Sequence, residues 1–175
     1  EQLNFEDIDN VFVSVGDGCT IYGVYKGFFD LLSLGIIKKI PKIIGVQSSG
    51  CSPFYDAWKS NRDLEETEEN TIADSIAVGI PRNPVKGLKA VSESNGFFMS
   101  VTDDEIIEAM KSIGKNEGIF AEPAAATSYA GLEKAIKNNL IRKDETTVVI
   151  VTGNGLKDQQ SILSRVGYIH EMTKE

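Results

Sequence analysis

Residues 11–20 read VFVSVGDGCT, a short apolar run rich in β-branched residues that ends at two closely spaced glycines. A run of this length and composition, stopped by Gly16, predicts a buried strand at 11–15. Apolar residues then recur at three-to-four spacing from Ile21 to Leu32, which predicts a helix over residues 20–34 that ends at Gly35. A glycine-rich turn therefore joins a strand to a helix.

The same alternation of strands and helices continues along the chain. We expect further strands at 42–46, 96–101 and 146–151, the last with the strongest signal, and a short extended segment at 119–121. We expect helices at 52–61, at 83–91, from Thr102 or Asp103 to just before Gly114, from Pro123 onward, and at 158–166. The charged residues 62–70 predict a solvated loop. This order of elements is typical of an α/β sheet covered by helices.

Length and composition fit one globular domain. The chain has 175 residues, of which 41% are hydrophobic and 25% charged, and its net charge is -8. An acidic surface repels phosphate backbones and anionic lipids, so neither nucleic acid nor a membrane is an expected partner. Cys19 and Cys51 are too few for a disulfide framework, which favours a reducing, cytoplasmic location. The chain begins at Glu1 without an initiator methionine, which suggests a piece of a longer protein.

The glycine-rich turn at residues 16–20 is a candidate anion site. Glycines after a buried strand allow a sharp turn, and the N–H groups that open the next helix point outward toward a ligand. The alternative is a plain strand-to-helix turn, since short glycine-rich turns are common. The turn has neither the Gly-Lys-Ser/Thr of a nucleotide-binding P-loop nor the glycine spacing of a dinucleotide fingerprint.

Two other segments are candidates for the same site. Thr152 follows the last expected strand and precedes Gly153-Asn154-Gly155, at the kind of strand end where open α/β sheets bind ligands. Alternatively, Thr152 merely ends the strand. Glu122 precedes the helix that opens at Pro123, where its carboxylate interacts well with the helix dipole, and the small residues that follow favour tight packing. No residue spacing indicates a metal site, and we expect no catalytic role for His170.

Taken together, these segments resemble the threonine synthase family of pyridoxal-phosphate (PLP) enzymes, which share the tryptophan-synthase β fold, also called fold type II. The resemblance rests on the turn at 16–21 with its helix, the segment 71–81, Glu122-Pro123-Ala124, and residues 152–158, in that order. It covers nearly the whole chain and implies a three-layer αβα domain. In such a domain, a mostly parallel sheet carries helices on both faces.

The resemblance also implies a role for each matching residue. The turn would hold the PLP phosphate through its N–H groups and the Thr20 hydroxyl, and the Thr152 hydroxyl would face the pyridine nitrogen. Ala73–Ser75 and Glu122 would border the cleft. Many family members have Asn at the position of Asp17, and a carboxylate beside a phosphate is unfavourable unless it points away or caps the helix. The expected cofactor-binding residues are Gly16, Asp17, Gly18, Cys19, Thr20, Glu122 and Thr152.

The family's cofactor-anchoring lysine lies early in the whole enzyme, and no lysine here matches it. Lys26 follows the phosphate turn and Lys157 follows Thr152, so neither occupies that context. Residues 1–175 are therefore expected to form the C-terminal PLP-binding domain of a homo-oligomeric enzyme, without the lysine-bearing half. The resemblance implies that the intact enzyme converts O-phospho-L-homoserine and water to L-threonine and phosphate, and that this chain alone is inactive.

Two other functions are compatible with these residues. A threonine/serine dehydratase or a cysteate synthase of the same fold would have a similar cofactor site and a different substrate. A non-catalytic α/β module that binds a small anion or a protein would have the same glycine turns for structural reasons.

Overall fold

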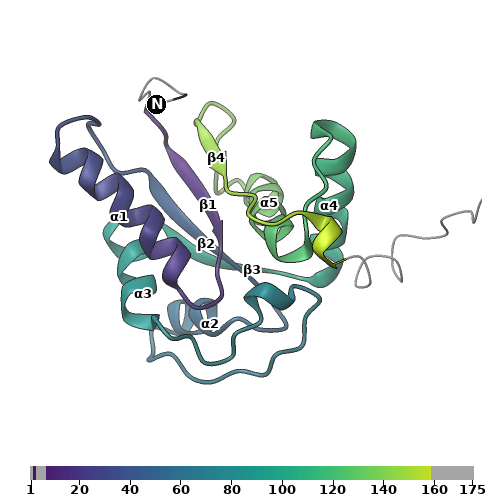
Figure 1. Cartoon of the computed structure of the whole chain (residues 1–175). Helices are drawn as coiled ribbons and strands as arrows, with labels where there is room; N and C mark the ends of the chain where they lie inside the picture. Colours follow the sequence, from purple (N-terminus) through teal and green to yellow (C-terminus); the bar gives the residue numbers. More distant parts are fainter. Residues whose placement is uncertain (1, 3–6, 159–175) are drawn as a thin grey trace, which may run out of the picture.

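The computed structural model describes residue 2 and residues 7–158, and a four-stranded parallel sheet lies at its centre (Figure 1). The strand order is β3-β2-β1-β4, and each of the three ladders is parallel. Residue Val11 pairs with Ile43 of β2 and with Val148 of β4. The strands are β1 (Asn10–Ser14), β2 (Lys42–Ser48), β3 (Phe97–Val101) and β4 (Thr147–Val149).

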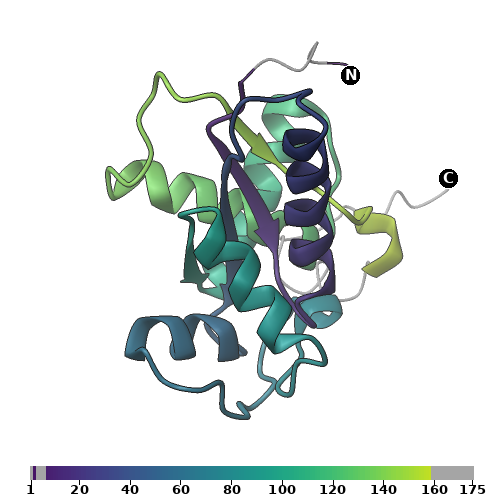
Figure 2. The ribbon, with the colours of Figure 1, turned by 90° about the vertical axis from the view of Figure 1, so that its left-hand side faces the viewer.

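Helices cover both faces of this sheet, which confirms the three-layer αβα architecture. One face carries α1 (Cys19–Ser33), α2 (Pro53–Ser60) and α3 (Pro84–Glu93), and the other carries α4 (Asp103–Glu117) and α5 (Pro123–Lys137). The two layers stand on opposite sides of the strands in Figure 1, and the layer of α1 and α3 is in front in Figure 2. Two short 3-10 helices, η1 (Asp74–Ile76) and η2 (Gly155–Asp158), lie in loops.

The core has two parts because successive strand residues point to opposite faces. Phe12 and Ile44 belong to the cluster under α4 and α5, whereas Val11, Val13 and Ile43 belong to the cluster under α1 to α3. All five side chains are at most 1% exposed. Burial on both faces explains why these strands appear in the sequence as unbroken apolar runs.

The helix after β3 is longer than expected. Its start is confirmed, because the Thr102 hydroxyl accepts the Glu105 N–H and the Glu105 carboxylate accepts the Thr102 N–H. The prediction that it ends before Gly114 is wrong: α4 continues to Glu117 and ends at Gly118, which has a φ of 68°. Gly118 terminates the helix because it adopts the left-handed conformation that glycine tolerates best, whereas Gly114 remains helical.

The strand expected at 146–151 is shorter in the structure, where β4 spans Thr147–Val149. Its side chains still alternate between the two core clusters as far as Val151. The ladder stops early because α5 takes over the hydrogen bonding: Ile150 donates its N–H to Phe12, but its carbonyl accepts the Ser128 hydroxyl at 2.9 Å. Most of the helix expected at 158–166 lies outside the described residues.

Tyr25 of α1 provides a pH-dependent test of the packing between α1 and α3. It is 5% exposed and donates its hydroxyl proton to the Glu93 carboxylate. Burial, followed by the hydrogen bond and the charge of Glu93, raises the pKa of Tyr25 to about 12. The protonated phenol therefore stabilises the fold fully below the reference pKa of about 10, and this contribution is lost as the pH rises through 12.

In an ultraviolet titration of tyrosine ionisation, Tyr25→Phe should remove one step near pH 12, because Tyr25 ionises there. If the step were unchanged, Tyr25 would not occupy the buried position described.

Candidate functional site

A pocket of about 250 Å³ opens at the C-terminal ends of β1 and β4. Ligands of parallel α/β sheets bind at these ends, since the loops that follow the strands meet there. Four segments line the pocket: residues 14–21, Ser75 with Ile76, Glu122 with Ala124, and Thr152. The candidate residues Gly16, Asp17, Gly18, Cys19, Thr20, Glu122 and Thr152 thus all line one cavity.

The turn at 16–20 lines this pocket and contains backbone N–H groups that have no hydrogen-bond partner among the described residues. Within the described part of the chain, no hydrogen-bond acceptor faces the N–H groups of Gly16, Asp17 and Gly18. The first residues of α1, Cys19 and Thr20, come too early in the helix to reach a helical carbonyl. Unpaired N–H groups that converge at a helix start form a site suited to a phosphate.

Close packing explains why the turn has glycine at residue 18. Its φ is +84°, and a Cβ atom there would lie 2.8 Å from both the Asn83 carbonyl oxygen and the Phe54 ring. A larger residue would thus strain the backbone and collide with its surroundings. Gly16 is also confined, because its Cβ would meet the Ile76 Cα at 3.1 Å. The 3-10 helix η1 therefore packs directly on the turn at 16–20, and its residues Ser75 and Ile76 form a wall of the pocket.

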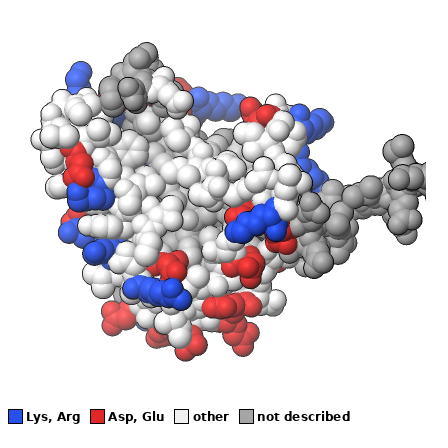
Figure 3. Space-filling view, viewed as in Figure 1, with Lys and Arg blue, Asp and Glu red and all other residues white. Residues whose placement is uncertain are grey.

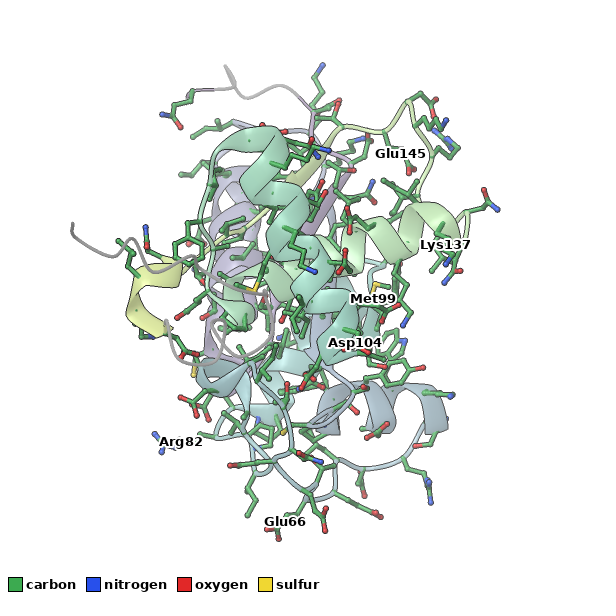
Figure 4. The ribbon with its side chains drawn as sticks, turned by 90° about the vertical axis from the view of Figure 1, so that its right-hand side faces the viewer. Glu66, Arg82, Met99, Asp104, Lys137 and Glu145 are labelled. Carbon is green, nitrogen blue, oxygen red and sulfur yellow. The ribbon has the colours of Figure 1, made fainter. Side chains whose placement is uncertain are left out.

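The Asp17 carboxylate is bound to the segment that leads into α3. It accepts the Arg82 backbone N–H at 3.1 Å, its Oδ1 lies 4.0 Å from the Arg82 Nε, and the Asp17 carbonyl accepts the Asn83 N–H. The side chain of Arg82 is 87% exposed at the lower end of the molecule (Figure 4). These bonds hold the turn at 16–20 against the start of α3. The Asp17 carboxylate therefore has a structural role in this turn.

Glu122 and Thr152 come together through the turn at 152–158. Glu122 donates its backbone N–H to the Gly153 carbonyl at 3.0 Å, and its carboxylate lies against Gly153, where a Cβ would approach the Glu122 Oε1 to 2.0 Å. The Glu122 side chain is 6% exposed and pairs with the Lys157 ammonium at 3.3 Å. Gly153 is therefore required for a buried carboxylate to sit beside Thr152.

The small residues after Glu122 serve mainly to pack α5 on the sheet, as their composition predicts. Ala125 and Ala126 are fully buried, and Gly131 lies so close to Val46 that a Cβ would be 2.5 Å from that side chain. Ala124, by contrast, lines the pocket. The close approach of α5 brings the Ser128 N–H within 3.0 Å of the Ser14 hydroxyl, which accepts it at the base of the pocket.

The sequence indicated no role for Ser14, which lines the pocket, or for the contacts that Lys157 makes with two lining residues. Ser14 is the last residue of β1, and this position at a strand end was the available signal. Lys157 belongs to the motif at 152–158, but its contacts with Glu122 and Ser75 join segments far apart in the chain, so no local pattern indicates them. Of the segment 73–75, only Ser75 lines the pocket. Neither lysine nor histidine is among the described lining residues.

The chemistry of the pocket is that of an anion cradle with two carboxylates at its edge. Asp17 and Glu122 are each paired with a basic side chain, Arg82 and Lys157 respectively. In Figure 3, charged side chains lie mostly around the rim of the face shown in Figure 1, and acidic ones gather at its lower end. Glu66, from the charged loop at 62–70, lies at this lower end in Figure 4. Free N–H groups, a neutral hydroxyl and a buried carboxylate suit a phosphorylated, polar small molecule.

Other features of the described residues bear on function. None of the helices between residues 7 and 158 combines the length and apolar character needed to cross a membrane. The same residues contain no cluster of His, Cys, Asp and Glu suited to a metal ion. Cys51 is buried and Cys19 is exposed, and both thiols are free. His170 lies outside the described residues.

Comparisons with known proteins place this arrangement in context. The family model "Pyridoxal-phosphate dependent enzyme" matches residues 1–153. The threonine synthases of Methanocaldococcus jannaschii and Methanosarcina acetivorans are 40% and 42% identical over 165 residues, which is 93% of this chain and 41% of each relative. The chain thus spans about two fifths of the length of these relatives.

Solved structures give the same fold. Threonine deaminase isoform 2 from Solanum lycopersicum superposes with a TM-score of 0.69 at 25% identity, over 85% of this chain and 40% of that one. An L-serine ammonia-lyase from Rhizomucor miehei has a TM-score of 0.72 at 20% identity, over 87% of this chain and 47% of that one. At 20% identity, the similarity to the L-serine ammonia-lyase concerns the fold alone.

Proposed function

The chain belongs to the family of pyridoxal-phosphate dependent enzymes, and on that premise we propose that it is the C-terminal cofactor-binding part of a threonine synthase. The substrate of the intact enzyme would be O-phospho-L-homoserine, which reacts with water to give L-threonine and phosphate. The observation that carries the proposal is about 40% identity to threonine synthases over 93% of the chain. The identity to threonine deaminase, 25% over 85% of the chain, is lower.

The residues of the pocket fit the proposed cofactor. The free N–H groups of residues 16–18 and the start of α1 match the acceptors of a phosphate monoester. We assign the cofactor phosphate to Gly16, Asp17, Gly18, Cys19 and Thr20, with Asp17 contributing its N–H because its carboxylate is bound to Arg82. Glu122, which lines the pocket, would border the cofactor ring.

Thr152 would lie opposite the pyridine nitrogen of the cofactor. A bound PLP ring acts as an electron sink for the reacting carbons of an amino acid. An aspartate next to the ring nitrogen would keep it protonated, whereas the neutral hydroxyl of Thr152 does not enforce protonation. This choice suits elimination and replacement better than transamination.

The catalytic lysine would come from outside these 175 residues. Covalent attachment of the cofactor needs an amine, and the described lining of the pocket contains no lysine. We propose that the chain alone has no turnover and that the intact cytoplasmic enzyme assembles as a homo-oligomer. Threonine formation by the purified chain would refute the first part, and a monomer in light scattering of the intact enzyme would refute the second.

Substrate assays of the complete gene product test the proposed reaction. Supplied with PLP, it should release threonine and phosphate from O-phospho-L-homoserine at least about 100-fold faster, in kcat/KM, than it deaminates threonine or serine, since a site built for a polar group discriminates strongly. The assay follows phosphate, threonine and 2-oxo acids in parallel. Deamination alone would assign the chain to a dehydratase. Replacement of the phosphate of O-phosphoserine by added sulfite, which gives cysteate and free phosphate, would assign it to a cysteate synthase. PLP binding without turnover on any substrate would favour a binding module.

A further inference from the structure

Lys157 makes two contacts at the edge of the pocket, although it does not line the pocket itself. Its Nζ lies 3.3 Å from the Glu122 Oε2 and donates to the Ser75 hydroxyl at 3.1 Å. Both partners line the pocket. A single ammonium therefore connects three segments that are far apart in sequence: η1, the residue before α5, and η2.

The backbone around Lys157 is fixed closely enough to direct this ammonium. Ala121 and Asn154 form a bridge, and Gly155 donates its N–H to Phe120 at 2.8 Å. The Asn154 side chain accepts the Leu156 N–H, and the Gly155 Cα lies so near the Phe120 ring that a Cβ would come within 2.6 Å of it. Such a constrained turn determines where the side chain of Lys157 begins.

The second contact matters because Ser75 belongs to the wall over the phosphate cradle. Ile76 of η1 packs on Gly16, and the loop that leads into η1 is held at Thr71 and Ile72 by the Asp103 carboxylate. The Ser75 hydroxyl is in turn held by its bond to Lys157. One end of this wall is thus anchored by α4 and the other by Lys157.

The pair of Lys157 and Glu122 also differs from the surface ion pairs of the chain. In Lys111–Glu108, for example, both side chains are at least 45% exposed, and such pairs contribute little. In Lys157–Glu122 the carboxylate is 6% exposed, although the lysine is 65% exposed. A buried charge depends on its partner far more than an exposed one does.

We infer that Lys157 is a positioning residue of the cofactor pocket: it holds Glu122 against Gly153 and η1 over the phosphate cradle, without touching the cofactor. The inference rests on the proposed function for the identity of the cofactor. The contacts of Lys157 with Glu122 and Ser75 join residues of this chain alone, so they can be tested independently of the cofactor.

The first test is hydrogen exchange of the complete gene product without added PLP. Lys157→Met should speed exchange of the Ile76 and Ala77 amides, which bond within η1, by about threefold or more, because local opening follows the loss of anchoring contacts. Lys157→Arg keeps the charge and should restore slow exchange. Lys137→Met is the matched control, since Lys137 lies at the end of α5 on the opposite side from η2 in Figure 4. Equal exchange in the wild type and Lys157→Met would overturn the inference.

The second test measures PLP affinity by the change in cofactor absorbance. Lys157→Met should weaken binding about tenfold, as the loss of supporting contacts around a site commonly does, and Lys157→Arg should recover most of it. If Lys157 acts partly through Glu122, the effects of Lys157→Met and Glu122→Gln should be less than additive. Fully additive effects would show that Lys157 does not act on PLP affinity through Glu122. If the wild type binds no PLP, the proposed function fails, and the exchange experiment still decides the role of Lys157.

Discussion

Replacing Phe54 with alanine should lower the free energy of unfolding by about 3–5 kcal/mol. Phe54 is fully buried near the start of α2 and stacks on Phe98 with ring centroids 5.3 Å apart. Its ring also fills the space between Gly18 and Gly87, where Cβ atoms would come within 2.8 and 2.6 Å of it. Truncation would leave a cavity that rigid strands and glycines are poorly able to close. Urea denaturation followed by circular dichroism measures the loss.

A matched truncation separates burial from side-chain size. Phe29 of α1 is 44% exposed, so Phe29→Ala should cost under about 1 kcal/mol in the same experiment. Equal losses for the two variants would mean that Phe54 does not occupy the core position described. Phe54→Ala should also disturb the turn at 16–20, since the ring packs against Gly18.

Local sequence signals were sufficient for most of the fold. The strands at Val11, Ile43 and Val101 and the helices after them follow from periodicity, capping residues and glycine breaks, because both faces of each strand are buried. The two boundary errors have different causes: a tertiary hydrogen bond ends β4 early, and the choice between two glycines sets the end of α4. The ladder of β4 ends early because Ser128 takes the Ile150 carbonyl, and α4 passes Gly114 to end at Gly118.

The candidate site divides in the same way. The turn at 16–20 and Thr152 were identifiable because strand ends and glycine turns are local features, and the structure places both at one pocket. The contact of Lys157 with Ser75 spans 82 residues and the bond between Ser14 and Ser128 spans 114. Patterns within a short stretch of sequence cannot predict contacts between residues so far apart, so only the structure shows these pairs.

The pairing of both pocket carboxylates has a consequence for anion binding. Asp17 and Glu122 would repel a phosphorylated ligand if they were unpaired. Arg82 and Lys157 balance them, and Arg82 does so from the side of α3. Under the proposed function, a phosphate bound at residues 16–20 would then meet N–H groups and hydroxyls rather than two unpaired carboxylates.

The strongest effect on the proposed cofactor site should come from Gly18→Ala, which should reduce PLP affinity of the complete gene product by about 100-fold or more. The new Cβ would lie 2.8 Å from the Asn83 carbonyl oxygen, a backbone atom that cannot rotate away, and the φ of +84° is itself unfavourable for alanine. The turn must then shift by a fraction of an ångström or more. Its N–H groups would no longer be placed to donate to one phosphate group.

Gly23→Ala provides the control, because Gly23 lies in α1, the helix that follows Gly18, and a Cβ atom there would meet nothing within 4 Å. This variant should leave PLP affinity unchanged and stabilise α1 by up to about 1 kcal/mol, since alanine favours the helix over glycine. Absorbance titration gives both affinities, and thermal unfolding gives both stabilities. If Gly18→Ala bound PLP as tightly as Gly23→Ala, residues 16–20 would not hold the cofactor phosphate. The glycine turn would then be a packing feature between α1, α2 and α3.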